Sequence, residues 1–384
     1  MNTPRPLATS SIARRLLLER QANALAQPAL QPFAKTPDEV FRPRRGARVL
    51  FGLCLAVLLI SGLLAVMIGS VSIPPRAVGQ LLLARFSLWP MAEIYPEAYA
   101  TILFDIRLPR VALMALAGAA LAAAGTTYQG LFRNPLADPY LVGVASGAGL
   151  GATLVLTFRL PATALGLMAV PLGAFFGGVL AVAIVVLTAR VGHGTPITTM
   201  LLAGVSIGSF ATALTTFWML RSPEGLRRAF NWLLGGYAGG GWVPVWIVLP
   251  YLAVGLIALQ LNARALNVLQ FDEEQARQLG LNVERLKLTL VGAATLMTAA
   301  AVAFGGLIGF VGLVTPHILR MLGGPDYRQL IPLSAVGGAA FLILADLIAR
   351  TVLAPQELPV GVITALTGTP FFIFLLRRLK RSVF

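Results

Sequence analysis

The sequence predicts an all-α integral membrane protein with ten transmembrane helices and short helices on the cytoplasmic side. Three observations lead to this prediction. Of the 384 residues, 57% are apolar and only 12% are charged, about half the charged share of a soluble domain. The apolar residues gather in ten runs, most of them close to the roughly 20 residues that a spanning helix needs. Basic residues are concentrated in alternate connections between these runs, as orientation in a membrane requires.

Residues 1–48 form a polar segment that carries nine Lys and Arg residues and no long apolar run. The segment lacks the short apolar core of a secretory signal peptide. We therefore expect a cytoplasmic N-terminal tail, partly disordered, with an amphipathic surface helix over residues 10–26 as the alternative. Residues 49–384 are expected to form the ten-helix domain.

The eighth apolar run is short and is followed within the same region by Pro316, so a buried or re-entrant helix is an alternative there. Counting it as a crossing places 21 Lys and Arg residues inside and 9 outside. It also brings the basic end, residues 377–381, to the cytoplasmic side with the N-terminus, in agreement with the positive-inside tendency. We therefore count ten crossings: 49–70, 111–128, 139–158, 162–188, 197–220, 243–262, 287–311, 313–323, 333–353 and 359–377.

Several kinds of chemistry lack their motifs in this sequence. No GxxxxGK loop followed by Ser or Thr is present, so we expect no ATP site and no enzymatic activity in this chain. His193 and His317 are the only histidines, and Cys54 is the only cysteine, so we expect no bound metal or cofactor and no internal disulfide. The net charge is +15. The basic residues that produce it lie between apolar spans, where orientation in a membrane explains them better than nucleic-acid binding does.

A polar hinge at residues 134–139, with two prolines, precedes Gly143, Gly147 and Gly151 at four-residue spacing. In water such a helix would be poor, because each interior glycine costs about 1 kcal/mol relative to alanine. In lipid the same spacing lets a neighbouring helix approach backbone to backbone. The three glycines therefore predict a helix-packing seam.

Asp346 is the one acidic residue well inside an apolar run, and Arg350 follows it four residues later on the same helix face. An ionisable residue within the membrane is a functional candidate, whereas an ion pair with Arg350 would give Asp346 a structural role. A secondary transporter would need such an acid for ion coupling. That class therefore remains the alternative.

Seven separated motifs resemble the permease subunits of bacterial ABC importers for iron siderophores, heme and cobalamin, the type II importers. They are IRLPR at 106–110, NPLADP at 134–139, LLAGV at 201–205, ARQLGL at 276–281, GFVGLVTPH at 309–317, AD with AR at 345–350, and ELPVG at 357–361. The resemblance covers nearly everything from residue 48 onward. It implies ten helices per subunit in the bacterial inner membrane, a homodimer around a central pathway, two separate ATPase subunits and a periplasmic substrate-binding protein.

The resemblance also implies roles for particular residues. It places docking to the binding protein on Arg107, Arg110 and Arg350, and a cytoplasmic gate on Asn134, Leu136, Thr198 and Thr199. Coupling to the ATPase falls on residues 265–281, with Asp272, Glu273, Glu274, Arg277, Leu279 and Gly280. Independently, the helical spacing and the glycine stop of that segment predict two short helices. The alternatives are arginines that anchor a helix end, an Asn134 that only makes a turn, and a solvated acidic helix face.

The substrate that the resemblance favours is heme. Residues 354–359, APQELP, and the last span are most similar to heme and cobalamin permeases. A ferric siderophore and cobalamin remain the alternatives. In each case the partner ATPase would use the ATP.

Overall fold

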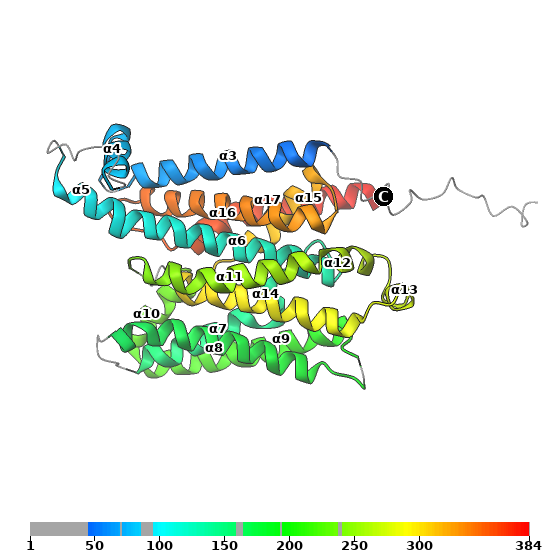
Figure 1. Cartoon of the computed structure of the whole chain (residues 1–384). Helices are drawn as coiled ribbons and strands as arrows, with labels where there is room; N and C mark the ends of the chain where they lie inside the picture. Colours follow the sequence, from blue (N-terminus) through cyan, green and yellow to red (C-terminus); the bar gives the residue numbers. More distant parts are fainter. Residues whose placement is uncertain are drawn as a thin grey trace, which may run out of the picture. The chain divides into compact units, whose positions relative to one another are not determined.

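The computed structural model describes residues 45–69, 71–85, 95–158, 164–192, 194–236 and 240–383. The chain divides into two units, Met1–Pro43 and Arg44–Phe384, and every element below belongs to the second. Most of the expected N-terminal tail, residues 1–44, lies outside the described residues. Within the described part the regular structure is helical, and the helices run side by side (Figure 1).

Each of the ten apolar runs forms a helix, which confirms the all-α membrane class. Among the described residues, seven helices are long and apolar enough to cross a membrane: α3 (Arg45–Met67), α6 (Leu108–Leu131), α8 (Ala164–Thr188), α9 (Ile197–Arg221), α11 (Val243–Leu261), α14 (Val283–Gly305) and α16 (Tyr327–Thr351). The other three runs form α7 (Val144–Thr157), α15 (Val311–Gly323) and α17 (Val360–Val383). Ten crossings therefore remain a prediction.

The second span begins earlier than the sequence indicates. Residues 71–110 are expected to be an external connection, but α4 (Pro75–Arg85) forms there, and α5 (Glu97–Thr101) and the wide π-turn η1 (Ile102–Arg107) continue directly into α6. The span runs from Ala98 to Leu131. Charged residues near residue 107 lower the local hydropathy and hide this start. Pro109 has no N–H to donate, and the wide turn directly before it lets the helix continue.

The third run forms a shorter helix than expected. A 3-10 turn, η2 (Pro139–Val142), is followed by Gly143 in the left-handed conformation, with φ of +87°, and only then by α7. The 14 residues of α7 span about 21 Å, less than the roughly 30 Å of a bilayer core. The hinge therefore occupies part of the depth that the sequence assigned to the helix.

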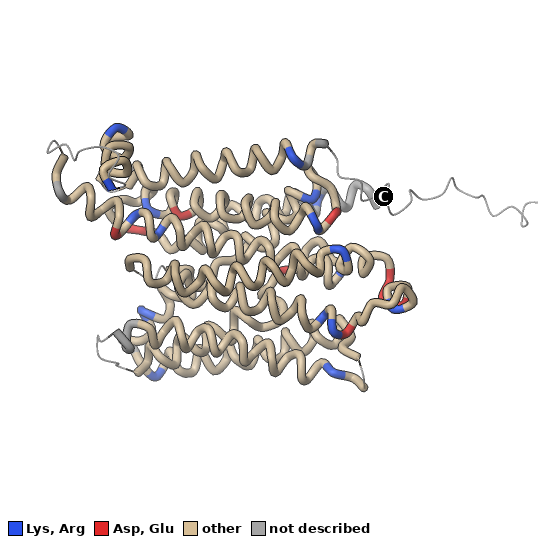
Figure 2. Tube along the Cα trace, viewed as in Figure 1, with Lys and Arg blue, Asp and Glu red and all other residues tan. Residues whose placement is uncertain are grey.

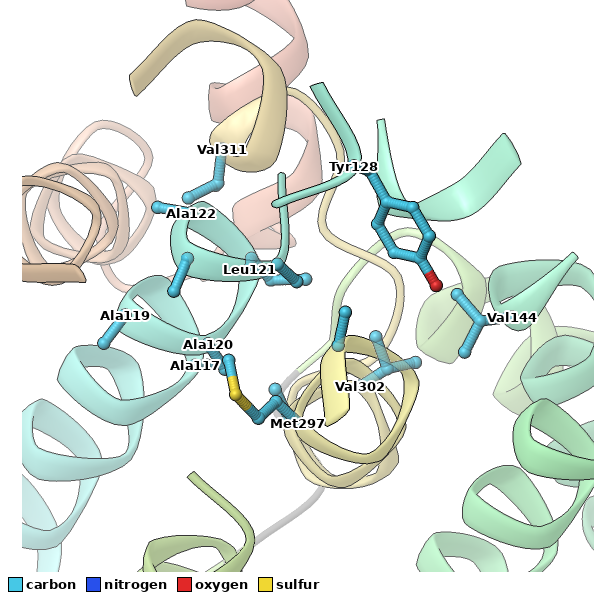
Figure 3. Close-up of a cluster of buried hydrophobic side chains, with 14 of the residues drawn as sticks. Ala117, Ala119, Ala120, Leu121, Ala122, Tyr128, Val144, Met297, Val302 and Val311 are labelled. Atoms are coloured by element: carbon cyan, nitrogen blue, oxygen red, sulfur yellow. The ribbon is translucent and has the colours of Figure 1, made fainter. Parts of the chain in front are cut away.

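Helix α6 lies at the centre of the packing and contacts α16, α14, α15 and α11. Its alanines face Met297 of α14 and the first turn of α15 (Figure 3). Gly118 of α6 meets Gly338 of α16, and Gly125 meets Gly312 of α15, so closely that a Cβ at Gly118 or Gly125 would overlap the partner's carbonyl group. Small residues thus bring three helices to backbone contact, which is how helices associate in lipid.

The short helices lie at opposite ends of the long ones (Figure 1). Helices α4 and α5 mark one end, here called the α5 end. Helices α12 (Ala263–Leu269) and α13 (Glu273–Gln278) mark the other, here called the α13 end. The outer helices α3 and α9 have only 17% and 22% of their most apolar windows buried, so most of their side chains face lipid or a partner.

Candidate functional site

Figure 2 shows basic and acidic residues close together at the α5 end. Asp346 lies between two of the three predicted docking arginines. Arg110 Nη2 lies 2.9 Å from Asp346 Oδ1, and Arg350 Nε lies 3.0 Å from Oδ2. Arg110 Nη1 also lies 2.7 Å from Oε2 of the half-exposed Glu357. The pair between Asp346 and Arg350, expected from their spacing, is confirmed. The contact with Arg110 is not predictable from spacing, because 236 residues separate Arg110 from Asp346.

Arg107 and Arg350 are buried in the single chain, each only 5% exposed. Arg107 donates to the carbonyl oxygens of Val66 (2.6 Å) and Met67 (2.9 Å), and Arg350 donates to that of Ala65 (3.1 Å). These carbonyl groups belong to the last turn of α3, where intrahelical donors run out. Two of the three predicted docking arginines thus close the end of α3 within this chain. Their docking role remains a prediction.

The predicted gate residues come from two places. Asn134 is exposed in the turn after α6, where its Oδ1 accepts the N–H of Leu136 at 2.9 Å, a local bond that asparagine favours in turns. Leu136 is half-buried. Thr198 is exposed and Thr199 half-buried in the first turn of α9.

Two of the three spaced glycines lie against α8. A Cβ at Gly147 would overlap the carbonyl group of Gly177, and a Cβ at Gly151 would overlap that of Gly173. Gly143 differs from the expectation. It precedes α7 in the left-handed conformation, and its Cβ position is 3.7 Å from its nearest neighbour, so it serves the turn and not the seam.

Two short helices form in the region of the expected coupling segment, residues 265–281: α12, which begins two residues before the segment, and α13. Asp272 Oδ1 accepts the N–H of Glu273 at 2.8 Å and caps α13. After Leu279, Gly280 takes a φ of +84°, which ends the helix. Leu279 is 72% exposed, so α13 presents an apolar side chain at its end.

Helix α12 is fixed to the start of α16. Asn267 donates to Asp326 Oδ1 at 2.7 Å and accepts the N–H of Tyr327 at 2.9 Å. Burial alone would raise the pKa of Asp326, but hydrogen bonds from Arg328 and Asn267 outweigh it and lower that pKa. The carboxylate therefore stays ionised near neutral pH and holds α12 in place.

Sequence reasoning missed a buried ion cluster beside α13. Lys287 of α14, whose side chain is 3% exposed, places Nζ 2.8 Å from Glu273 Oε2 and 3.3 Å from Glu284 Oε1. Nζ also donates to the carbonyl oxygen of Thr195 at 3.1 Å, and the N–H of Thr195 donates to Glu284 Oε2 at 2.8 Å. The only signal in the sequence was a charged residue at the edge of an apolar run.

A family model, the FecCD transport family, matches residues 57–378. The cobalamin import permease BtuC of Halobacterium salinarum is 45% identical over 288 residues, 75% of this chain and 76% of that protein. The hemin transport permease HmuU of Yersinia pestis is 40% identical over 331 residues, 84% of this chain and 97% of that protein.

Among solved structures, one described as an inward-facing metal-chelate type ABC transporter is similar with a TM-score of 0.74 and 28% identity. The alignment covers 86% of this chain and 99% of that one. Sequence and fold thus agree over most of the described residues. The chain belongs to the FecCD transport family and is an ABC transporter permease.

Proposed function

We propose that this chain is the permease subunit of an ABC importer for a metal chelate, and that the chelate is heme. The observation that supports this most is the family match over residues 57–378, together with relatives named for hemin and cobalamin. Identities of 40% and 45% to these relatives do not separate the two substrates. Heme is chosen on the resemblance of residues 354–359 and the last helix, with cobalamin and a ferric siderophore as the alternatives.

The proposed assembly has two copies of this chain, two ATPase subunits and a periplasmic binding protein, in the bacterial inner membrane with both termini cytoplasmic. The exposed face of α9 supports the proposal that two copies of this chain assemble. This face, with Ser209, Thr212 and Thr216, forms a groove of about 630 Å³ with Ser146 of α7. This face of α9 is exposed and grooved in the single chain, so we propose that it meets the second copy, with the pathway between two α9 helices.

The test of this function is transport by the reconstituted complex. Permease and ATPase are placed in liposomes with the binding protein, and uptake of heme, cobalamin and a ferric siderophore is measured against ATP consumed. We expect ATP-dependent heme uptake, and no saturable ATP hydrolysis by the permease alone. Uptake driven by an ion gradient without the ATPase would instead establish a secondary transporter.

The exposed face of α13 is expected to contact the ATPase. Glu274 is 66% exposed there, whereas Glu273 points toward Lys287. Glu274→Lys should weaken assembly with the ATPase severalfold at low salt, because reversal places like charges across an interface. Copurification of the two subunits measures the effect. Asp105→Lys, the same charge change at the α5 end, should leave assembly intact; equal loss in both variants would remove the assignment to α13.

The α5 end is expected to receive the binding protein through its positive charge. Since Arg107 and Arg350 are buried, the test changes the exposed Glu357, which shares Arg110 with Asp346. Glu357→Gln should speed association with the binding protein at low salt, and the gain should shrink as salt screens it. Stopped-flow association measures the rate. If neither salt nor this substitution changes the association rate, the arginines have a structural role within the chain and do not dock the binding protein.

A further inference from the structure

We propose that Lys287 and Glu284 are positioning residues that tie α13 to the start of α9, so that the two move together. The tie, here called the Lys287 link, consists of Lys287, Glu284, Glu273 and the backbone of Thr195. The inference rests on the proposed function, in which α13 meets the ATPase and the start of α9 contributes to the gate. It adds the physical connection between those two elements.

The contacts of Lys287 come from three parts of the chain. Glu273 belongs to α13, Glu284 to the first turn of α14, and Thr195 to the connection between α8 and α9. An ammonium group has three N–H donors, and three acceptors lie within 3.3 Å of this one. Lys287 is therefore the point at which α13, α14 and the start of α9 are joined.

Thr195 is held from both sides of its backbone. Its N–H donates to Glu284 and its carbonyl oxygen accepts from Lys287. Pro196, whose ring fixes φ, follows, and α9 begins at Ile197. No flexible segment separates the link from α9, so a displacement of Thr195 is passed to the first turn of α9, which carries Thr198.

The ammonium group at the centre of the link is buried and therefore depends on its partners. Lys287 is 2% exposed, and an ammonium group out of water is costly unless carboxylates and carbonyl groups surround it. Hydrogen bonds in such surroundings are also stronger than in water. Apart from Lys287, α13 contacts α14 through a longer ion pair, 3.9 Å between Arg277 Nη2 and Glu284 Oε1, and through residues 279–282, where Gly280 makes a left-handed turn. The Arg277 side chain is half-exposed, so this contact is weaker than that of Lys287. Without Lys287, the tie between α13 and the start of α9 is therefore loosened.

A distance measurement on the permease itself tests the link. In a Cys54→Ala background, spin labels at Gln278 of α13 and Thr198 of α9, both exposed, report the separation of the two elements by pulsed EPR. We expect a narrow distribution for the unmodified link and a broad, shifted one for Lys287→Met. Arg285→Met, which removes an exposed cation two residues away on α14, is the control and should keep the narrow distribution. Lys287→Arg should restore most of it.

The assembled complex provides the second measurement. Lys287→Met should still bind the ATPase through the outer face of α13, while stimulation of ATP hydrolysis by the loaded binding protein should fall about fivefold or more, fivefold being the lower end of typical coupling between two sites. If Lys287→Met does not fold, Glu284→Gln replaces it in both experiments, with a smaller broadening expected.

The two proposals fail in different ways. A distance distribution and a stimulation that both stay unchanged in Lys287→Met would overturn the link and leave the importer function standing. A wild-type complex without stimulated hydrolysis would overturn the importer function, and the distance measurement would still decide whether α13 and α9 are tied together.

Discussion

Gly147→Leu is expected to prevent the permease from folding in the membrane. The Cβ alone would overlap the carbonyl group of Gly177 and the side chain of Ala181. Overpacking a core costs about 1–3 kcal/mol when side chains can move aside, but a carbonyl group moves only with its whole helix. Helix α7 would therefore separate from α8. Membrane expression and size-exclusion chromatography in detergent measure the result, and we expect little monodisperse protein.

The control for this variant is Gly292→Leu. Gly292 also lies within a long helix, α14, but nothing lies within 4 Å of its Cβ position, which is exposed. Leucine there should be tolerated and should slightly favour the helix. Normal chromatographic behaviour of Gly147→Leu would mean that α7 and α8 are not held at backbone contact.

Asp346→Asn is the second substitution with a large expected effect. Asp346 is 2% exposed and is the carboxylate that faces both Arg110 and Arg350. Removing one partner from a buried ion pair typically costs about 3–5 kcal/mol, because the remaining charge stays out of water. We therefore expect a marked fall in thermal stability, measured by unfolding in detergent. Glu357→Gln, which touches the same Arg110 from a half-exposed position, should cost less than about 1 kcal/mol.

The same variant separates the two classes of transporter. In an ABC permease, Asp346 has a structural role, so Asp346→Asn lowers stability, and the molecules that remain folded keep ATP-dependent uptake. In a secondary transporter the carboxylate would carry the coupling ion. Stable protein with no uptake would favour that class and contradict the structural role.

Much of the fold was predictable, because hydropathy reports burial in lipid directly. All ten apolar runs became helices, and the acidic segment with a glycine stop became two short ones. The four-residue spacing of Asp346 and Arg350 indicated their pair, because both lie on one helix. Such inferences need only the geometry of a single helix.

The features that were not predicted correctly are those that depend on contacts between helices. Charges around Arg107 made the start of the second span look like a loop, although its guanidinium is satisfied by carbonyl groups of α3. Gly143 shared the spacing of the seam but took a positive φ. The role of Lys287 was not predictable, because its acceptors come from three segments that only the folded chain brings together.

The glycine pairs at the helix crossings limit how this sequence can vary. Where Gly118 meets Gly338, a larger residue on one helix cannot be accommodated by shortening the other, because neither has a side chain to lose. The contact of Gly255 with the side chain of Met297 is different. There the methionine can shrink, so Gly255→Ala has a compensating change within reach. Each glycine of such a pair therefore prevents substitution of the other, and substitutions in this protein are expected at positions outside these pairs.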